Sequence, residues 1–504
     1  MILSNAGSMH ALLPVIVVAV TGMVVLLGDA CIGFWRRQGW ISGVLSVLGV
    51  AVAAAISLGH MDDIGWQPTL AFNGSLNVDS FATACGLVLL LAAAVAVLLG
   101  MTYLQNRGIN HGEYHALVLF ATCGGMIMAS ANDLITLFIA VEILSVAFYV
   151  LAGFDTANPR SDEAALKYFL LGAFASGFLL YGIALIYGGS SSQATPGTTN
   201  LTHLATALHV EHPSGMLVAG LALLLVGLGF KAALVPFHAW APDVYEGAPT
   251  SAAAFMACAA KVAAFAAILR VLNAFVTLSE FWLTAIQVMA VLSMFGGNLW
   301  AIAQQNVKRM LAYSSIAHAG YLLVAVSAAG VAGSRLTHNA AMGAAIFYLL
   351  AYTLMTLGAF GVLVWLTRRG HDVQTLDDVR GLAKRDPLPA YVMLIFMLSL
   401  GGIPPTMGFM GKWFIFYAAL QAGQLWLAIC LAVASIFSIY YYLRVVWVMC
   451  FQEPAEGATE PTRRRWEGGA ALSMASTAAG TLLFGVLPGL AQGLMAAAAS
   501  IIRP

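Results

Sequence analysis

Four charged residues lie within stretches of sequence that are otherwise apolar. They are Lys231 in "LLVGLGFKAALVPFHAW", Lys261 in "FMACAAKVAAFAA", Lys412 in "FMGKWFIF" and Glu142 in "LFIAVEILSVAF". A charge at the centre of a membrane-spanning helix costs roughly 2.5–3.5 kcal/mol even on mild insertion scales. We therefore expect these four side chains to face the protein interior, water or one another, and not lipid.

Lysine and glutamate in such positions are suited to proton transfer. Burial lowers the proton affinity of an ammonium group, and a nearby carboxylate raises it again. A lysine under both influences gains or loses a proton near neutral pH, whereas an arginine keeps its proton. A change in the separation of Glu142 and a lysine then changes how tightly the lysine holds its proton, which is the basis of a pump. A static ion pair that only holds helices together is the alternative interpretation.

Three further basic residues lie nearer the ends of apolar stretches. Lys167 is one turn into its stretch, so the sequence leaves open whether it transfers protons or extends to the membrane interface. Arg270 and Arg444 lie toward the ends of theirs. For both arginines we expect a structural, anchoring role.

The polar stretch "FHAWAPDVYEGAPT" (237–250) follows Lys231 closely. We expect it at the cytoplasmic side, as a connection whose side chains collect protons; these are His238, Asp243, Tyr245 and Glu246. The alternative is an ordinary loop between two helices, with Asp243 or Thr250 as a helix cap.

A second polar stretch, "NVKRMLAYSSIAHAGY" (306–321), leads into another apolar run. Its imidazole, His318, and its hydroxyl groups could hold a chain of water molecules; the hydroxyls belong to Tyr313, Ser314, Ser315 and Tyr321. A lone histidine in a helix is more often structural. Here we expect His318 to form a polar, hydrated line near mid-membrane with Lys261 and Lys412.

Composition defines the class of protein that must position these groups. The chain has 504 residues, of which 61% are hydrophobic and 9% are charged, against about 25% charged in soluble domains. It is therefore expected to be an all-α integral membrane protein. The formal net charge is zero, which argues against a nucleic-acid partner.

Cofactor motifs are not evident in the sequence. The six cysteines are scattered without a C-x-x-C pair, which argues against metal or cluster binding. We find no Walker loop, dinucleotide fingerprint, metal-ligand cluster or haem-ligand pattern. We therefore expect no cofactor and no metal in this chain, and an energy source in a gradient or in partner subunits.

Apolar runs of about 20 residues predict membrane-spanning helices. We expect about fourteen, near 11–29, 41–58, 80–102, 114–131, 134–153, 164–188, 215–236, 250–273, 281–301, 315–332, 339–366, 388–421, 425–450 and 469–492.

Two of these spans are predicted to be broken. The run 388–421 is too long for one ordinary span and contains "GGIPPTMGFMGKW", while Pro236 follows Lys231 by five residues. Proline within a span frees backbone carbonyls, which is tolerated only where protein or a water-filled cavity satisfies them. Two interrupted helices, each with a lysine near its break, indicate inverted repeats with a site near mid-membrane.

The distribution of lysine and arginine predicts the orientation in the membrane. With the N-terminus outside, fourteen basic residues lie in cytoplasmic loops and two, Arg335 and Arg503, on the opposite side. By the positive-inside rule both termini then face the periplasm. The polar loop 189–214 has no Lys or Arg and faces outward. The fourteen are Arg36, Arg37, Arg107, Arg160, Lys308, Arg309, Arg368, Arg369, Arg380, Lys384, Arg385, Arg463, Arg464 and Arg465.

Three stretches together resemble a known family. "GFKAALVPFHAWAPDVYEGAPT", "NVKRMLAYSSIAHAGY" and "GGIPPTMGFMGKW" are similar to segments of the antiporter-like subunits of respiratory complex I. That family is shared with multisubunit cation/proton antiporters and membrane-bound hydrogenases. The resemblance covers nearly the whole chain.

The resemblance implies a role for each buried charge. Glu142 matches the fifth-helix glutamate that pairs with the seventh-helix lysine, here Lys231. Lys261 matches the eighth-helix lysine that links two half-channels, and Lys412 the residue on the exit side. Lys167 lies where the family often has a sixth-helix lysine.

The family's fold implies one transmembrane domain, 1–504, built from two inverted five-helix repeats. Helices 4–8 (114–273) and 9–13 (281–450) form the repeats, with helices 7 and 12 broken. Helices 1–3 (1–102) and 14 (469–492) flank them.

The resemblance also implies a setting for the chain. It would be a proton-translocating subunit in the inner membrane of a bacterial cell, without a redox centre of its own. Its partners would be other membrane subunits, including a second antiporter-like subunit and small helical subunits, with flavin and iron–sulfur clusters in partner subunits. The alternative is a subunit of a multisubunit sodium/proton antiporter. A dedicated sodium site would need several oxygen ligands at one depth, and Glu142 is the single deep carboxylate in the sequence.

Overall fold

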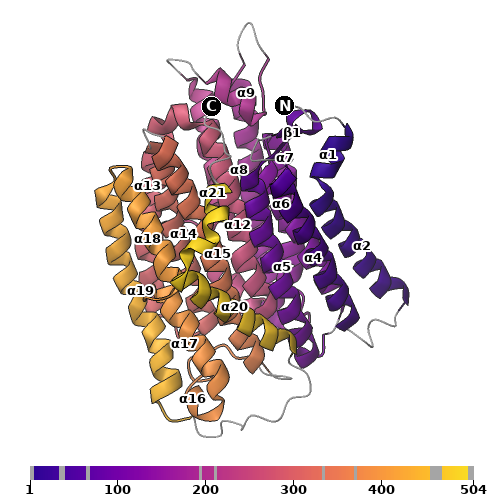
Figure 1. The fold of residues 1–504 in the computed structure, drawn as a ribbon, viewed down its shortest axis with the longest axis vertical. Helices are drawn as coiled ribbons and strands as arrows, with labels where there is room; N and C mark the ends of the chain where they lie inside the picture. Colours follow the sequence, from indigo (N-terminus) through magenta and orange to yellow (C-terminus); the bar gives the residue numbers. More distant parts are fainter. Residues whose placement is uncertain are drawn as a thin grey trace.

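The fold is an elongated bundle of helices that run close to its long axis (Figure 1). The structure is a computed structural model that describes residues 5–32, 40–63, 69–109, 111–191, 196–208, 213–331, 335–367, 372–454 and 468–497. Each of the fourteen expected spans contains one helix or two consecutive helices. The predicted helical membrane fold is therefore confirmed.

The helices of the first part of the chain include two short ones, α1 and α9, at its surface. In order they are α1 Asn5–Ala11, α2 Leu13–Ile32, α4 Trp40–Asp63, α5 Ser80–Arg107, α6 Glu113–Ser130, α7 Leu134–Ala152, α8 Pro159–Gly189, α9 Leu201–Ala207, α10 Gly215–Lys231, α11 Trp240–Gly247 and α12 Thr250–Ala274.

The remaining helices continue the bundle. They are η2 Val276–Leu278, α13 Ser279–Ile302, α14 Val307–Val331, α15 Arg335–Leu366, α16 Leu382–Arg385, α17 Pro387–Gly401, α18 Met407–Gln421, α19 Leu425–Phe451, α20 Gly468–Val486, η3 Pro488–Ala491 and α21 Gln492–Ala497.

A small hairpin between α4 and α5 was not expected from the sequence. Strand β1 (Thr69–Ala71) pairs antiparallel with β2 (Leu76–Val78) around the short turn η1 (Phe72–Gly74). Its three-residue strands are too short to show a period-2 pattern. The outward loop 189–214 likewise contains a helix, α9, which the prediction did not include.

Polar residues start several of the membrane helices. Asp79 accepts a hydrogen bond from Ala82 N at the start of α5, and Asp133 accepts from Ile135 N and Thr136 N at the start of α7. Asn158 caps α8, whose first residue is a proline. These side chains satisfy backbone donors that the first helical turn leaves without partners.

Both predicted breaks are present. Among the described residues, eleven helices are long and apolar enough to cross a membrane, and two shorter apolar helices are α10 and α17. The segments α10 and α11 form one interrupted span, and α17 and α18 form another. The first break lies directly after Lys231, earlier than Pro236 suggested.

The stretch 237–250, expected as a polar connection at the cytoplasmic side, is largely helical. Its residues 240–247 form α11, whose Trp240, Val244 and Tyr245 are buried. Neither Asp243 nor Thr250 caps the next helix, since α12 begins after Pro249 without a side-chain cap. The apolar residues of α11 let it continue the interrupted span instead.

Three helices form the centre of the bundle. The most apolar window of α12 is entirely buried within the protein, and α14 and α15 are nearly so. Helix α12 is rich in alanine ("TSAAAFMACAAKVAAFAA"), and small residues allow membrane helices to approach closely. Lys261 and His318 lie on these central helices.

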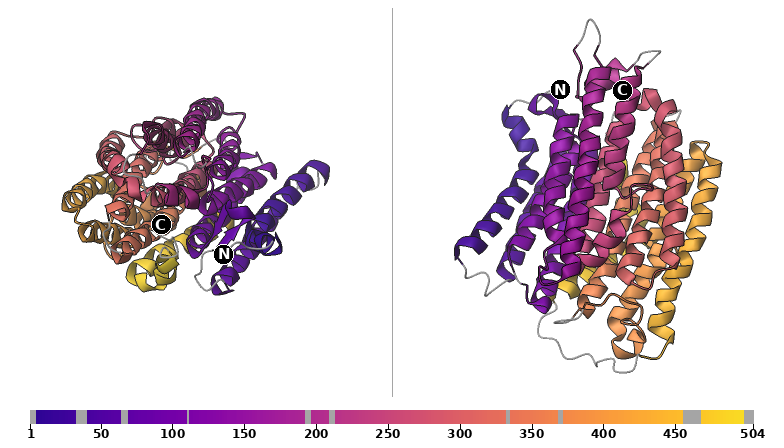
Figure 2. Two further views of the ribbon diagram at one scale, coloured as in Figure 1. Left: turned by 90° about the horizontal axis from the view of Figure 1, so that it is seen from above. Right: turned by 180° about the vertical axis from the view of Figure 1, so that it is seen from behind.

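Different segments of the chain lie at the two ends of the bundle. Figure 1 places the N and C labels at the same end as α9, with α16 at the opposite end. Figure 2 shows the first helices at one edge of the bundle and α19 near the opposite edge, while α20 packs against α5 and α15 between them.

Candidate functional site

Lys231 is the last residue of α10 and lies at the break of the first interrupted helix. Its side chain is 3% exposed. Its ammonium group donates to Ser145 Oγ on α7 at 2.8 Å and to Tyr168 Oη on α8 at 3.4 Å. The break therefore brings Lys231 between two helices of the same half of the chain.

Aromatic rings complete the surroundings of Lys231. Its Nζ lies 5.4 Å from the ring centroids of Phe148 and Tyr168, and 5.9 Å from that of Tyr149. A desolvated cation–π contact contributes up to about 2 kcal/mol, and a hydrogen bond from a charged group about 1.5–3 kcal/mol. These contributions are as large as the cost of placing the charge in the membrane.

Glu142 lies near Lys231 but does not pair with it directly. It accepts a hydrogen bond from Ser176 on α8 and is half-buried. Both residues lie in the described part of the chain, and no ion pair of 4.0 Å or less joins them there. One helical turn separates Glu142 from Ser145, the residue that holds Lys231. The direct pair implied by the family resemblance is absent from the described residues, where Lys231 and Glu142 are hydrogen-bonded to two different serines.

Lys261 lies in the middle of α12 and is 2% exposed. Its Nζ donates to the backbone oxygen of Ser315 on α14 at 2.5 Å and lies 5.1 Å from the centroid of Tyr352 on α15. It therefore contacts both other central helices. Because α12 is enclosed on all sides, Lys261 does not face lipid.

Lys412 lies in α18 and reaches back to the break in its own span. Its Nζ donates to the carbonyl oxygens of Leu400 at 3.2 Å and Gly401 at 3.0 Å, the last residues of α17. The last carbonyls of a helix have no partner within it and carry a partial negative charge. The ammonium group therefore satisfies the end of α17.

Gly402 makes this contact of Lys412 possible. Gly402 has a φ of 82°, so its backbone is in the left-handed conformation. Glycine adopts this conformation without steric cost. A Cβ at this position would also lie 3.1 Å from Lys412 Nζ. Any larger residue would both strain the turn and displace the ammonium group.

His318 lies on α14 between the two lysines of the centre and is 1% exposed. Its Nδ1 lies 2.6 Å from Tyr348 Oη, and its Nε2 lies 3.1 Å from Tyr442 Oη. Tyr442 in turn is hydrogen-bonded to Ser314. Both ring nitrogens therefore have hydroxyl partners, as a group that accepts and donates protons requires.

Ser315, His318 and Tyr321 are spaced three residues apart on α14, so they lie along one face of it. We call these three residues the α14 seam. Lys261 binds the backbone of Ser315, and Lys412 lies 5.0 Å from the ring centroid of Tyr321. The seam thus runs from one buried lysine to the other with His318 in the middle, which supports the predicted polar line.

The seam continues beyond Lys412 through further buried polar groups. Asn298 donates to Tyr321 Oη at 3.0 Å and accepts from Tyr441 Oη at 2.9 Å. Ser327 donates to Gln424 Oε1 at 3.1 Å, closer to the end of α14. The sequence analysis missed these residues, although polar side chains inside apolar runs are a signal for them.

Tyr313 does not belong to the seam. Its ring lies 5.9 Å from Trp300 and 6.0 Å from the guanidinium group of Arg309. His238 stacks on the other side of the same cluster, with its ring 4.6 Å from that of Trp300. The structure thus places His238 beside Trp300 and Tyr313, and not in contact with Lys231.

Lys167 belongs to an exposed network of charges at the end of the bundle. It pairs with Glu163 at 2.7 Å and Asp243 at 2.8 Å, and Arg309 pairs with Asp243 at 2.6 Å and with Glu246 at 2.9 Å. This network links α8, α11 and α14. The sequence left open whether Lys167 transfers protons or extends to the membrane interface. Its partly exposed position in this network fits the interface.

Lys308 was expected in a loop and is instead fully buried in the first turn of α14. It donates to the backbone oxygen of Ala248 at 2.7 Å, at the end of α11. Nearby, Tyr103 donates to Asp372 at 2.9 Å. The loop assignment was wrong because "NVKRM" begins a helix with its lysine turned inward.

The two peripheral arginines anchor the structure, as expected. Arg270 forms two 2.9 Å hydrogen bonds with the carboxylate of Asp79, and its Nε donates to Ala129 O. Arg444 donates to the carbonyl oxygens of Ile302 and Gln304, beyond the end of α13. Both contacts hold helices together without reaching the lysines.

Comparison with known proteins places the chain in a family. Residues 131–438 match the family described as NADH:quinone oxidoreductase/Mrp antiporter, TM. The chain is 41% identical to the NADH-quinone oxidoreductase subunit N of Trichlorobacter lovleyi over 490 residues, which cover 95% of each chain. It is 44% identical to subunit N 1 of Herpetosiphon aurantiacus over 468 residues, which cover 91% of each.

Solved structures agree with the sequence relatives. A chain of respiratory complex I from Thermus thermophilus with bound aureothin is 36% identical, with a TM-score of 0.76 over 96% of this chain and 99% of that one. A chain of the Mrp complex from Dietzia has a TM-score of 0.82 over 99% of this chain and 97% of that one. At 22% identity this second likeness shows the fold alone.

The stretches "APDVYEGAPT" and "SSIAHAGY" predict subunit N among the antiporter-like subunits. The curated relatives confirm that prediction, because those with this name match nearly the whole chain. The chain therefore belongs to the NADH:quinone oxidoreductase/Mrp antiporter family and, within it, to the subunit N proteins of NADH-quinone oxidoreductase.

Proposed function

We propose that this chain translocates protons across the membrane through Lys231, Lys261, His318 and Lys412. It is a membrane subunit of respiratory complex I, an NADH-quinone oxidoreductase, and it belongs to the antiporter-like subunits of that enzyme. The observation that carries the relay is the α14 seam, which joins two buried lysines through a histidine with a hydroxyl group at each ring nitrogen.

Each lysine in the proposed relay contacts groups that favour its charged form without fixing it in an ion pair. Lys231 has a hydroxyl and aromatic rings, while Lys261 and Lys412 have backbone carbonyls. A lysine held by a buried carboxylate would release its proton only at a large electrostatic cost. Neutral partners leave the ammonium group able to lose its proton when a neighbouring charge changes.

The segment between Lys231 and Lys261 is aromatic. Tyr168 stacks on Trp240 at 4.4 Å, and Trp240 meets Tyr245 edge-on at 6.2 Å. We propose that proton transfer crosses this segment through the hydroxyl groups of Tyr168 and Tyr245. Glu142 would then set the electric field to which Lys231 responds.

Two inverted repeats are proposed for the architecture, 114–273 and 281–450, within a single domain. The two interrupted spans support this division, because one lies in each half and each presents a lysine at its break. Residues 1–102 and 469–492 would flank the repeats.

The chain is proposed to lie in the bacterial inner membrane with both termini in the periplasm. In Figure 1 both termini lie at the same end of the bundle. The positive-inside rule predicts that this end faces the periplasm. Seven of the fourteen residues counted for this rule lie outside the described residues, namely Arg36, Arg37, Arg368, Arg369, Arg463, Arg464 and Arg465.

The proposed partners are other membrane subunits of complex I, including a second antiporter-like subunit and small helical subunits. Flavin and iron–sulfur clusters would reside in the partner subunits, with no cofactor in this chain. The rival function, a sodium/proton antiporter, is less well supported, because carbonyl and hydroxyl groups around the three lysines are already bound to ammonium groups.

The test is to purify the complex from native membranes through a tag on this chain. We expect flavin- and iron–sulfur-bearing subunits to co-purify. In proteoliposomes the complex should acidify one side on addition of NADH and a quinone, without sodium. Purification with other cation-antiporter subunits alone, or a strict requirement for sodium, would contradict the proposal.

A further inference from the structure

A buried carboxylate at the end of α2 has no cationic partner among the described residues. Asp29 is 2% exposed, and among the described residues it accepts one hydrogen bond, from the backbone N–H of Gly112 at 3.0 Å. A buried charge is costly unless it is paired or coordinates a metal. Asp29 lies far from the proposed relay, on the flanking helices of the bundle.

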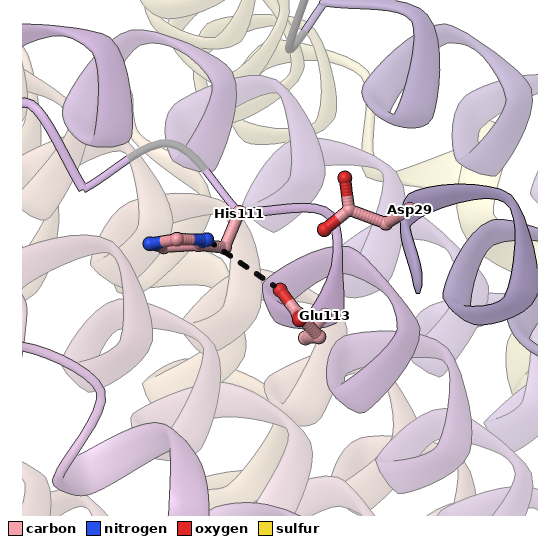
Figure 3. A group of neighbouring side chains, drawn as sticks. All are labelled: Asp29, His111 and Glu113. Carbon is pink, nitrogen blue, oxygen red and sulfur yellow. Dashed lines mark ion pairs between the residues drawn. The ribbon is translucent and has the colours of Figure 1, made fainter. Parts of the chain in front are cut away.

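Two further groups that bind metals lie against Asp29. His111 lies two residues before α6 and Glu113 is its first residue. The ligand atoms of the three residues lie within 4.8 Å of one another. Figure 3 shows the Glu113 carboxylate between the His111 ring and the Asp29 carboxylate. His111 Nδ1 is 3.8 Å from Glu113 Oε2. The three side chains therefore offer one imidazole nitrogen and two carboxylate oxygens within reach of a single cation.

A second titratable side chain, His115, is buried near Asp29. His115, on the same helix as Glu113, is 0% exposed, and neither ring nitrogen has a hydrogen-bond partner among the described residues. Asp29 is the charged group with which His115 interacts electrostatically. A fully buried imidazole without partners is uncommon, and imidazole is a metal ligand.

We propose that Asp29, His111 and Glu113 form a binding site for one divalent cation of the Zn²⁺ type, joining the end of α2 to the start of α6. Zn²⁺ takes four ligands from histidine nitrogens and carboxylate oxygens at about 2.0–2.2 Å. Three protein ligands leave the fourth position for a water molecule. The imidazole nitrogen of His111 favours Zn²⁺, because Ca²⁺ and Mg²⁺ prefer oxygen ligands.

The ligand atoms are close to the spacing that such an ion requires. Bonds of 2.0–2.2 Å in a tetrahedron place neighbouring ligand atoms roughly 3.4 Å apart. The His111–Glu113 distance of 3.8 Å is near that value. The His111 side chain is 47% exposed and can turn toward the other two ligands. The hydrogen bond from Gly112 orients the Asp29 carboxylate. Carboxylates that bind metals are commonly held by such a hydrogen bond.

The test measures zinc bound to the intact purified complex. Wild type, Asp29→Asn and His111→Ala would be equilibrated at micromolar free Zn²⁺ and analysed by elemental mass spectrometry. His203→Ala, an exposed histidine on α9, is the matched control. Wild type and control should each hold one more zinc per complex than the other two variants, whose affinity at this site should fall at least about tenfold. Excess Mg²⁺ should not displace the ion.

Equal zinc content in all four proteins would overturn the proposal. Because His111 is half-exposed, His111→Ala is expected to assemble and can decide the matter even if Asp29→Asn does not. The proton relay does not enter this experiment, so failure of the proposed function would leave its outcome unchanged.

Discussion

Glu142 lies one helical turn before Ser145 on α7, the residue that accepts a hydrogen bond from Lys231 on α10, yet Glu142 and Lys231 form no ion pair with each other. Lys231 donates to Ser145 Oγ at 2.8 Å, while Glu142 accepts from Ser176 on α8. The carboxylate can therefore influence the ammonium group through the electric field without holding it. An interaction of this kind changes strongly when either side chain moves by a few ångströms.

Removal of either charge should disable the pump without disassembling it. We expect Lys231→Ala and Glu142→Gln to keep normal levels of the complex and its NADH oxidation in detergent, while proton uptake into vesicles falls strongly. Lys231 is buried and Glu142 is half-buried, and each variant removes one of these two electrostatically interacting charges. Lys384→Ala, at an exposed residue of α16, is the control and should pump normally. Normal pumping by Lys231→Ala would show that this lysine is not a carrier.

Replacement of Lys231 by arginine distinguishes a carrier from a fixed charge. Arginine preserves the positive charge but does not release its proton at neutral pH. We therefore expect Lys231→Arg to pump nearly as poorly as Lys231→Ala. The measurement is the number of protons moved per NADH in proteoliposomes. Pumping at the wild-type ratio would mean that Lys231 only supplies an electric field.

The sequence was sufficient to predict the helical fold, both breaks and the buried lysines. A lysine in an apolar run of 20 residues must avoid contact with lipid, because a charge in lipid is costly. The burial of Lys261 and Lys412 within the protein follows from that cost. Proline and glycine near Lys412 likewise mark the break that its ammonium group satisfies.

The partners of these lysines could not be predicted from the sequence, because they depend on the rotation of helices that pack far apart in the chain. Ser315 contacts Lys261 through its backbone, which no side-chain pattern reveals. Lys167 and Tyr313 are as polar as the residues of the seam but turn toward the exposed network. Asp29 and His111 meet only because α2 packs against α6.

The orientation of the chain can be tested by accessible cysteines. In a background with the six native cysteines replaced, Thr206→Cys on α9 and Asp377→Cys near α16 both lie at exposed positions. Because α9 and α16 lie at opposite ends of the bundle, a membrane-impermeant thiol reagent added to intact cells with a permeabilised outer membrane should label Thr206→Cys. Asp377→Cys should be labelled only after the inner membrane is opened. The reverse pattern would contradict the proposed orientation, and labelling of both from one side would contradict the fold.

Loss of the buried Arg270–Asp79 pair should affect stability and not pumping as such. Breaking a buried ion pair by removing one partner costs about 3–5 kcal/mol, because the other charge is left unpaired. We expect Arg270→Met to lower the amount of assembled complex and its melting temperature, measured by native electrophoresis and thermal denaturation. The double variant Arg270→Met with Asp79→Asn should recover much of the loss, because asparagine removes the unpaired charge and can still cap α5. Arg335→Met, at an exposed residue, is the control, and equal stability of Arg270→Met and this control would contradict an anchoring role.

The α14 seam predicts a pair of variants whose effects are not additive. Tyr442→Phe removes the hydroxyl that lies 3.1 Å from His318 Nε2 and is bonded to Ser314, and Tyr348→Phe removes the hydroxyl at Nδ1. Each should slow proton translocation, because a relay through an imidazole needs a partner at both nitrogens. With His318→Gln as the third variant, adding either tyrosine change should lower the rate little further, since the relay is already interrupted. Tyr440→Phe, on the exposed side of α19, should have no effect. If the tyrosine variants lowered the rate by the same factor with and without His318, the hydroxyls would act elsewhere, and the seam would not be the route between Lys261 and Lys412.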